Sequence, residues 1–152
     1  MNDAEYMRLA LALAERGRGW TAPNPMVGAV IVKDGAVIGQ GWHERYGEPH
    51  AERNALASCT ADPAGGTMYV TLEPCQMCAG AIVQARIPEV MIGCMNPKAG
   101  CAGSVLNLLE VEGFNHKVKI TKGILQEECS SMLSEFFREL RQEKKMKKEE
   151  KS

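Results

Sequence analysis

Apolar residues recur along this chain with two different periods, and the two periods alternate. A spacing of three or four residues predicts a first helix, which starts at an N-cap on Asp3 and stops at Gly17, and a long last helix with an apolar stripe from Leu125 to Leu140. Shorter helices are expected at residues 50–59, 76–86 and around 105–109. Apolar runs predict five strands, which lie at residues 27–32, from 37 onward, and at 67–72, 90–93 and 118–121.

Strands that alternate with helices predict an α/β layer sandwich. A chain of 152 residues is long enough for one domain with a proper core and too short for two. We expect a single domain over residues 1–142 and a charged, mobile tail over 143–152. The sequence has no run of apolar residues long enough to span a membrane and begins with no secretory signal, which predicts a cytoplasmic protein without a membrane partner.

The net charge of −1 does not by itself indicate a nucleic-acid-binding protein. The charge is unevenly spread, however, because basic residues outnumber acidic ones over residues 138–152. Two interpretations of this segment stay open. It is either the solvated end of a helix or a surface that contacts phosphates.

Two short motifs carry metal-binding chemistry: His50-Ala51-Glu52, and Pro74 followed by Cys75 and Cys78. Zinc prefers four tetrahedral nitrogen or sulfur ligands, and a catalytic site takes three from the protein and leaves the fourth position for water. His50, Cys75 and Cys78 make such a set, which predicts one Zn²⁺ per chain. Each motif follows a proline that can open a helix, so two helix N-termini would converge on the metal and favour the thiolates.

Glu52 lies too close to His50 in sequence for both to be free ligands of one ion, so we interpret Glu52 as the catalytic proton carrier. It would take a proton from water that zinc acidifies and pass protons to the ring nitrogen and to the departing ammonia. The pair of motifs is the known signature of zinc deaminases. A purely structural zinc site is the alternative, but it would need a fourth Cys or His nearby, and none has suitable spacing. The other four cysteines are expected to be small buried apolar residues.

At these residues the chain resembles the cytidine deaminase-like superfamily, which implies a three-layer α-β-α fold with a five-stranded mixed sheet. Residues 2–74 resemble the deaminase domain of the bifunctional riboflavin biosynthesis enzyme, and the similarity is carried by residues 21–28, 41–43, 47–52 and 68–74. From residue 75 onward the chain resembles the bacterial tRNA adenosine deaminase, through residues 78–83, 96–104, 114–116 and 128–138. We interpret the chain as a mosaic of two family members, natural or engineered.

The riboflavin-type resemblance implies that Asn24 and His43 line a pyrimidine pocket. Plain structural roles compete with this, because Asn24 precedes a proline in a turn and His43 sits at a strand end where it can cap a turn. The chain also departs from this family. Its two cysteines are closer together, and the Gly-Lys-Thr-Pro-Pro loop whose lysine helps to hold a phosphorylated substrate is absent.

The tRNA-type resemblance implies that an anticodon loop packs on the Gly-rich loop and the last helix, where Lys98, Phe137 and Arg138 match family positions. A flipped adenosine would be recognised by stacking and by hydrogen bonds to its edge. Asn96, where many members have Asp, and Ala51 complete the candidate substrate-binding set. The position of His43 is usually Asn in that family. Ordinary roles also fit Lys98, a loop lysine, and Phe137, which stands one step off the core stripe that includes Phe136.

Three hypotheses follow. The first is a deaminase that converts adenosine to inosine at the tRNA wobble position, and the second is a deaminase of the riboflavin-pathway diaminopyrimidine or another small base. The third is a non-catalytic zinc protein that binds RNA. Both resembled families imply oligomers, so we expect a homodimer.

Overall fold

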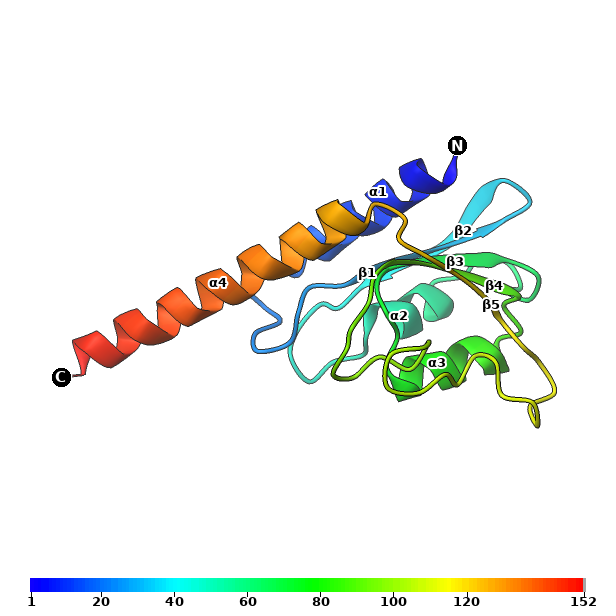
Figure 1. The fold of residues 1–152 in the computed structure, drawn as a ribbon. Coiled ribbons are helices and arrows are strands. Elements are labelled where there is room, and N and C mark those ends of the chain that lie inside the picture. The colour runs from blue at the N-terminus through cyan, green and yellow to red at the C-terminus, as the bar shows by residue number, and fades with distance from the viewer. Residues whose placement is uncertain (152) are drawn as a thin grey trace.

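The computed structural model describes residues 1–151 and has a five-stranded mixed sheet between two layers of helices. The strand order is β2-β1-β3-β4-β5 (Figure 1). Strand β1 pairs antiparallel with both β2 and β3, whereas β3, β4 and β5 run parallel. The predicted α/β sandwich and its mixed sheet are therefore confirmed.

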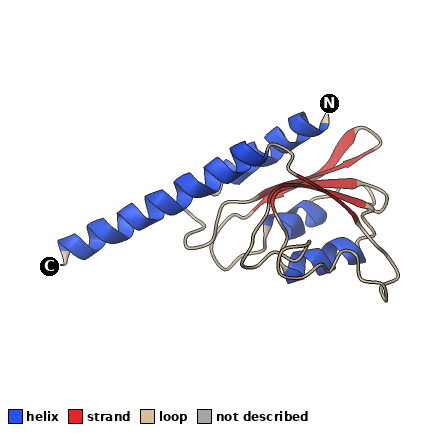
Figure 2. Ribbon diagram, in the orientation of Figure 1, coloured by secondary structure: helices blue, strands red, loops and turns tan. Residues whose placement is uncertain are grey.

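The five predicted strands and four of the five predicted helices are present along the chain (Figure 2). The elements are α1 Asp3–Glu15, β1 Gly28–Lys33, β2 Ala36–Trp42, α2 Ala51–Ala57, β3 Thr67–Leu72, α3 Gln76–Gln84, β4 Glu89–Cys94, β5 Lys119–Lys122 and α4 Gln126–Glu150.

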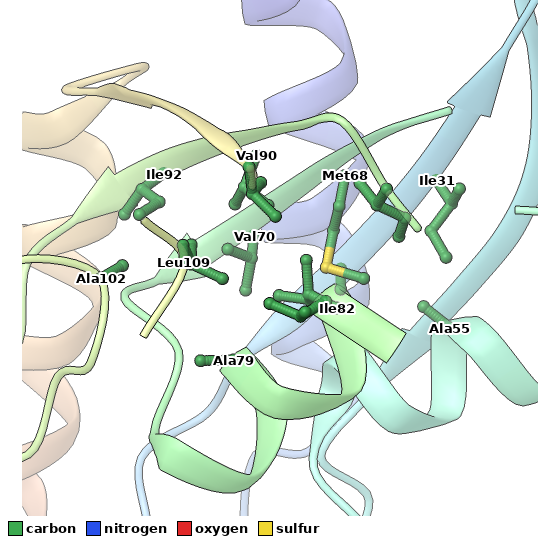
Figure 3. Close-up of a cluster of buried hydrophobic side chains, with 14 of the residues drawn as sticks. Ile31, Ala55, Met68, Val70, Ala79, Ile82, Val90, Ile92, Ala102 and Leu109 are labelled. Atoms are coloured by element: carbon green, nitrogen blue, oxygen red, sulfur yellow. The ribbon is translucent and has the colours of Figure 1, made fainter. Parts of the chain in front are cut away.

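Each face of the sheet is covered by one pair of helices. Helices α2 and α3 cover one face, and Figure 3 shows the core between them and the sheet. Its side chains include Ala55, Met68, Val70, Ala79, Ile82, Val90 and Ile92, all of which are fully buried. Helices α1 and α4 cover the other face, where Met7 and Ala10 pack with Tyr69 and Cys129. The three central strands β1, β3 and β4 are buried almost throughout, which explains their mainly apolar sequences, whereas β5 lies at the edge and is largely exposed.

Two local predictions are wrong. The N-cap of α1 is Asn2 rather than Asp3, because the Asn2 side chain accepts a hydrogen bond from the backbone N–H of Glu5 at 2.9 Å. Asp3 is instead the first helical residue, and its carboxylate accepts a hydrogen bond from the Tyr69 hydroxyl.

The helix expected around residues 105–109 is absent, and the segment consists of turns. Its backbone N–H groups bond to distant carbonyls instead of forming helical bonds. Val105 donates to Gly100 and Leu108 donates to Cys101. Leu109 is nevertheless fully buried, so the apolar pattern marks a core contact rather than a helix.

The last helix is longer than its apolar stripe. Cys129, Met132 and Phe136 are its buried residues, whereas every residue from Arg141 to Lys151 is exposed. Figure 1 shows this end of α4 projecting beyond the rest of the fold. The division into a domain and a mobile tail stays a prediction, although the helix continues to Glu150. None of the helices that the structure describes combines the length and the apolar character of a membrane-spanning segment.

Candidate metal centre and active site

Two helices begin at the same point of the molecule. His50 is the N-cap of α2 and Cys75 is the N-cap of α3, and a proline directly precedes each of them. The sulfurs of Cys75 and Cys78 each lie 3.5 Å from Nδ1 of His50. The three candidate ligand atoms all lie within 4.8 Å of one another. The two helix starts therefore bring together the nitrogen and sulfur donors that the sequence predicts.

The thiols of Cys75 and Cys78 differ in pKa, which is lowered in the first and raised in the second. A hydrogen bond from the Cys78 thiol lowers the pKa of Cys75 to about 5, and it outweighs the opposing effect of burial. The same shared proton raises the pKa of Cys78, and burial raises it further. Both shifts have the same origin, because the thiol proton of Cys78 is directed at the sulfur of Cys75. A divalent cation can replace that proton, because metal binding to thiols releases protons.

Glu52 is the second residue of α2 and is buried, with 3% of its surface exposed. Burial raises the pKa of its carboxyl group to about 7. Glu52 also lines the cavity beside the metal ligands, together with His50 and Cys75. A carboxyl group that is poised near neutral pH beside a metal centre suits the transfer of protons.

The cavity next to these residues has a volume of about 160 Å³. This volume is close to the ~150 Å³ that accommodates a benzene ring inside a protein, so the cavity suits an aromatic ring. Asn24, His43 and Asn96 also line it. The structure therefore brings seven predicted residues to one place: Asn24, His43, His50, Glu52, Cys75, Cys78 and Asn96.

Hydrogen bonds fix Asn24 and His43 in the cavity wall. Nδ1 of His43 lies 3.2 Å from the carbonyl oxygen of Pro49, and its Nε2 lies 3.3 Å from the Asn24 side-chain nitrogen. Because a carbonyl oxygen only accepts, the proton of the neutral ring belongs on Nδ1, and Nε2 accepts from Asn24. The His43 ring also packs edge-on against His50, with the ring centroids 5.4 Å apart.

Other predicted substrate-binding residues lie elsewhere. Ala51 is the first residue of α2 and is fully buried in the core. Lys98, Phe137 and Arg138 do not line this cavity or the neighbouring cavity, whose volume is about 450 Å³ and which shares Asn24 and His50 with it. Phe137 is partly exposed on α4 and contacts Phe136. Roles for these four residues stay predictions.

Sequence reasoning assigned no role to Glu73, which the structure places in the same cavity wall. Glu73 follows β3 and is 3% exposed, and its carboxylate accepts hydrogen bonds from the backbone of Asn96, Ala102 and Ser104. Burial acts to raise the pKa of Glu73, but hydrogen bonds from Ser104, Asn96 and Ala102 outweigh it and lower the pKa. The signal in the sequence was an acidic residue directly after an almost fully buried strand, because a charge in such a position needs hydrogen-bond partners.

A model of the cytidine and deoxycytidylate deaminase zinc-binding region matches residues 1–94 of the chain. The riboflavin biosynthesis protein RibD of Actinobacillus pleuropneumoniae is 44% identical over 143 residues, which are 90% of this chain and 37% of that protein. The tRNA-specific adenosine deaminase of Bacillus subtilis is 42% identical over 152 residues, which are 94% of this chain and 93% of that protein. The chain thus spans little more than a third of the first relative and nearly all of the second.

Solved structures of both kinds share the fold. A diaminohydroxyphosphoribosylaminopyrimidine deaminase/reductase from Thermotoga maritima matches with a TM-score of 0.77 and 36% identity, over 93% of this chain and 42% of that one. A tRNA deaminase that performs A-to-I editing at the wobble position matches with a TM-score of 0.69 and 30% identity, over 85% of this chain and 99% of that one.

Proposed function

Because the chain belongs to the cytidine and deoxycytidylate deaminase family of zinc-binding hydrolases, we propose that it deaminates adenosine in tRNA at the wobble position. Glu52 acts as the proton carrier in this proposal. The observation that carries it is the match to a tRNA-specific adenosine deaminase over nearly the full length of both chains.

The donor set fits zinc. Two sulfurs and one imidazole nitrogen can converge on a single ion, and three protein ligands leave one tetrahedral position free. His50, Cys75 and Cys78 would hold the ion. When bound, zinc would supply a water molecule with a pKa near neutrality.

Glu52 would move the protons of the reaction. It would accept a proton from the attacking water, donate one to the ring nitrogen and assist the departure of ammonia as the carbon–nitrogen bond breaks. Water is consumed and ammonia released, so the carboxyl group ends each cycle in the protonation state in which it began. Burial of the Glu52 carboxyl group excludes competing solvent and raises its pKa to about 7. A group that carries protons is most effective when its pKa is close to the pH of the reaction.

Asn24 would orient the base. Its side-chain nitrogen is committed to His43, so its carbonyl oxygen is the atom left to accept a hydrogen bond from an N–H group of the substrate. Outside this cavity, a tRNA substrate would extend over the loop at residues 96–104 and over α4, where Lys98, Phe137 and Arg138 would contact it.

A second candidate has its own support. The riboflavin-type resemblance implies that Asn24 and His43 line a pyrimidine pocket, and both residues line the cavity, where they are hydrogen-bonded to each other. The similar protein of Buchnera aphidicola, a diaminohydroxyphosphoribosylamino-pyrimidine deaminase, is 37% identical, and the matched region covers 97% of its length. Deamination of that pyrimidine is therefore the alternative function.

Ammonia release by zinc-loaded protein separates the two candidates. The substrates are a tRNA anticodon stem-loop with a wobble adenosine and the diaminopyrimidine phosphate of the riboflavin pathway, offered in parallel. Turnover of the stem-loop alone supports the proposal, whereas turnover of the pyrimidine alone replaces it with the alternative. Zinc binding without turnover of either would favour the non-catalytic hypothesis. We also propose a homodimer, and a monomeric mass in solution would contradict that.

A further inference from the structure

The loop at residues 96–104 forms one wall of the base cavity through Asn96 and Ala99, yet it contains no helix or strand. A wall without regular structure needs fixed contacts if it is to hold a defined shape. Four hydrogen bonds from this loop meet at the Glu73 carboxylate.

Both carboxylate oxygens of Glu73 are committed to the loop. Oε1 accepts from the backbone N–H of Asn96 at 2.9 Å and from the hydroxyl of Ser104. Oε2 accepts from the backbone N–H groups of Ala102 and Ser104, both at 2.9 Å. A buried carboxylate that accepts this many bonds replaces the water it has lost, and it gathers three backbone donors that would otherwise stay unpaired.

The fit around the carboxylate is close. A side chain at Gly100 would overlap the carboxyl atoms of Glu73, so the loop can wrap this group only because residue 100 is glycine. A further bond runs from the backbone N–H of Cys101 to the carbonyl oxygen of Pro74, at 2.8 Å. The chain from Glu73 to Cys75 therefore fixes the loop at one end and presents a metal ligand at the other.

We propose that Glu73 is a positioning residue for the substrate, because it holds the loop at residues 96–104 as the wall of the base cavity at a set distance from the metal ligands. It does not take part in the chemistry. The inference deepens the proposed deaminase function and rests on it for its kinetic test, but the structural part of the test is independent of activity.

The test compares full-length Glu73→Gln with Ser104→Ala, which removes one of the four bonds, and with Glu110→Gln, an exposed loop residue that lines neither cavity. In Glu73→Gln an amide NH₂ group replaces one acceptor and faces backbone donors. We expect hydrogen exchange at residues 96–104 to accelerate by about tenfold or more, while β3 and α3 stay protected. KM for the substrate that wild type turns over should rise by about tenfold with a smaller loss in kcat.

Zinc content should stay at the wild-type value in all three variants. Ser104→Ala should show the same pattern with smaller shifts, and it keeps the test decisive if Glu73→Gln does not fold. Unchanged loop exchange in both variants, or a fall in kcat with unchanged KM, would overturn the proposal, and so would loss of zinc from a folded Glu73→Gln. If wild type turns over neither substrate, the proposed function fails, while hydrogen exchange still decides whether Glu73 anchors the loop.

Discussion

Glu52 and Glu73 are equally buried, yet their pKa values move in opposite directions. Glu52 is dominated by the loss of water, which disfavours the charged form and raises its pKa to about 7. Burial acts on Glu73 in the same direction, but hydrogen bonds from the loop stabilise its charge and lower its pKa. The sequence predicts a role for Glu52 but does not reveal the environment of Glu73, because the hydrogen-bond donors to Glu73 lie more than twenty residues further along the chain.

Replacement of Glu52 by Gln should leave the metal centre intact and remove the proton carrier. We expect kcat for ammonia release to fall by about 10²- to 10⁴-fold, because an amide cannot exchange a proton with water or with the leaving group. Zinc measured by atomic absorption should stay at one ion per chain. Glu5→Gln, on the exposed side of α1, serves as the matched control. Activity that survives in Glu52→Gln would exclude the mechanism.

At the scale of the elements, the apolar periods predicted most helices and strands, because burial on one face leaves a repeat that can be read in the sequence. They failed at residues 105–109, where Val105 and Leu106 are exposed and the core contacts come from the buried Leu109 and the partly buried Leu108. The hydrogen bonds that shape this loop join residues far apart, such as Glu73 and Ser104, so a local pattern could not reveal them. The metal ligands were predictable because each motif is short and marks a helix start.

Removal of the metal should loosen the junction of α2 and α3 as well as stop the reaction. We expect chelated protein to lose ammonia release and its Tm to fall by about 5–10 °C, because a tightly bound ion stabilises the folded state by a few kcal/mol. Added zinc should restore both. Cys78→Ser should reproduce the chelated state, whereas Cys59→Ser, outside the site, should retain zinc. An unchanged Tm after verified zinc removal would contradict the proposed link between the two helix starts.

Close packing of α1 on β1 depends on the absence of a side chain at Gly28, where a Cβ atom would overlap the Ala10 carbonyl oxygen. Gly28→Ala should therefore destabilise the protein by at least about 2 kcal/mol. Gly80, inside α3, has open space around it, so Gly80→Ala should stabilise by about 0.5–1 kcal/mol through helix propensity. Urea unfolding midpoints measure both. Similar midpoints for the two variants would show that the packing argument is wrong.

At the scale of the whole molecule, the core and the site lie apart from the end of α4. Because residues 141–151 are exposed, a chain that ends at Gln142 should keep its Tm within about 2 °C. If tRNA is the substrate, its affinity for the stem-loop should fall and depend less on salt, because several lysines are lost. Fluorescence anisotropy over a salt series measures this. If the truncated and full-length chains have equal affinities and equal salt dependence, the basic segment does not contact the RNA and is only a solvated helix end.

The metal ligands come from two parts of the chain that are separated in sequence. Cys75 and Cys78 are close in sequence, so two thiolates can capture an ion before the sheet exists. His50 is separated from them by α2 and β3, so bringing it to the ion closes a longer loop and costs more chain entropy. If the chain refolds with cobalt in place of zinc, absorption from thiolate coordination should therefore appear first. The spectral change from imidazole coordination should follow when the native topology has formed.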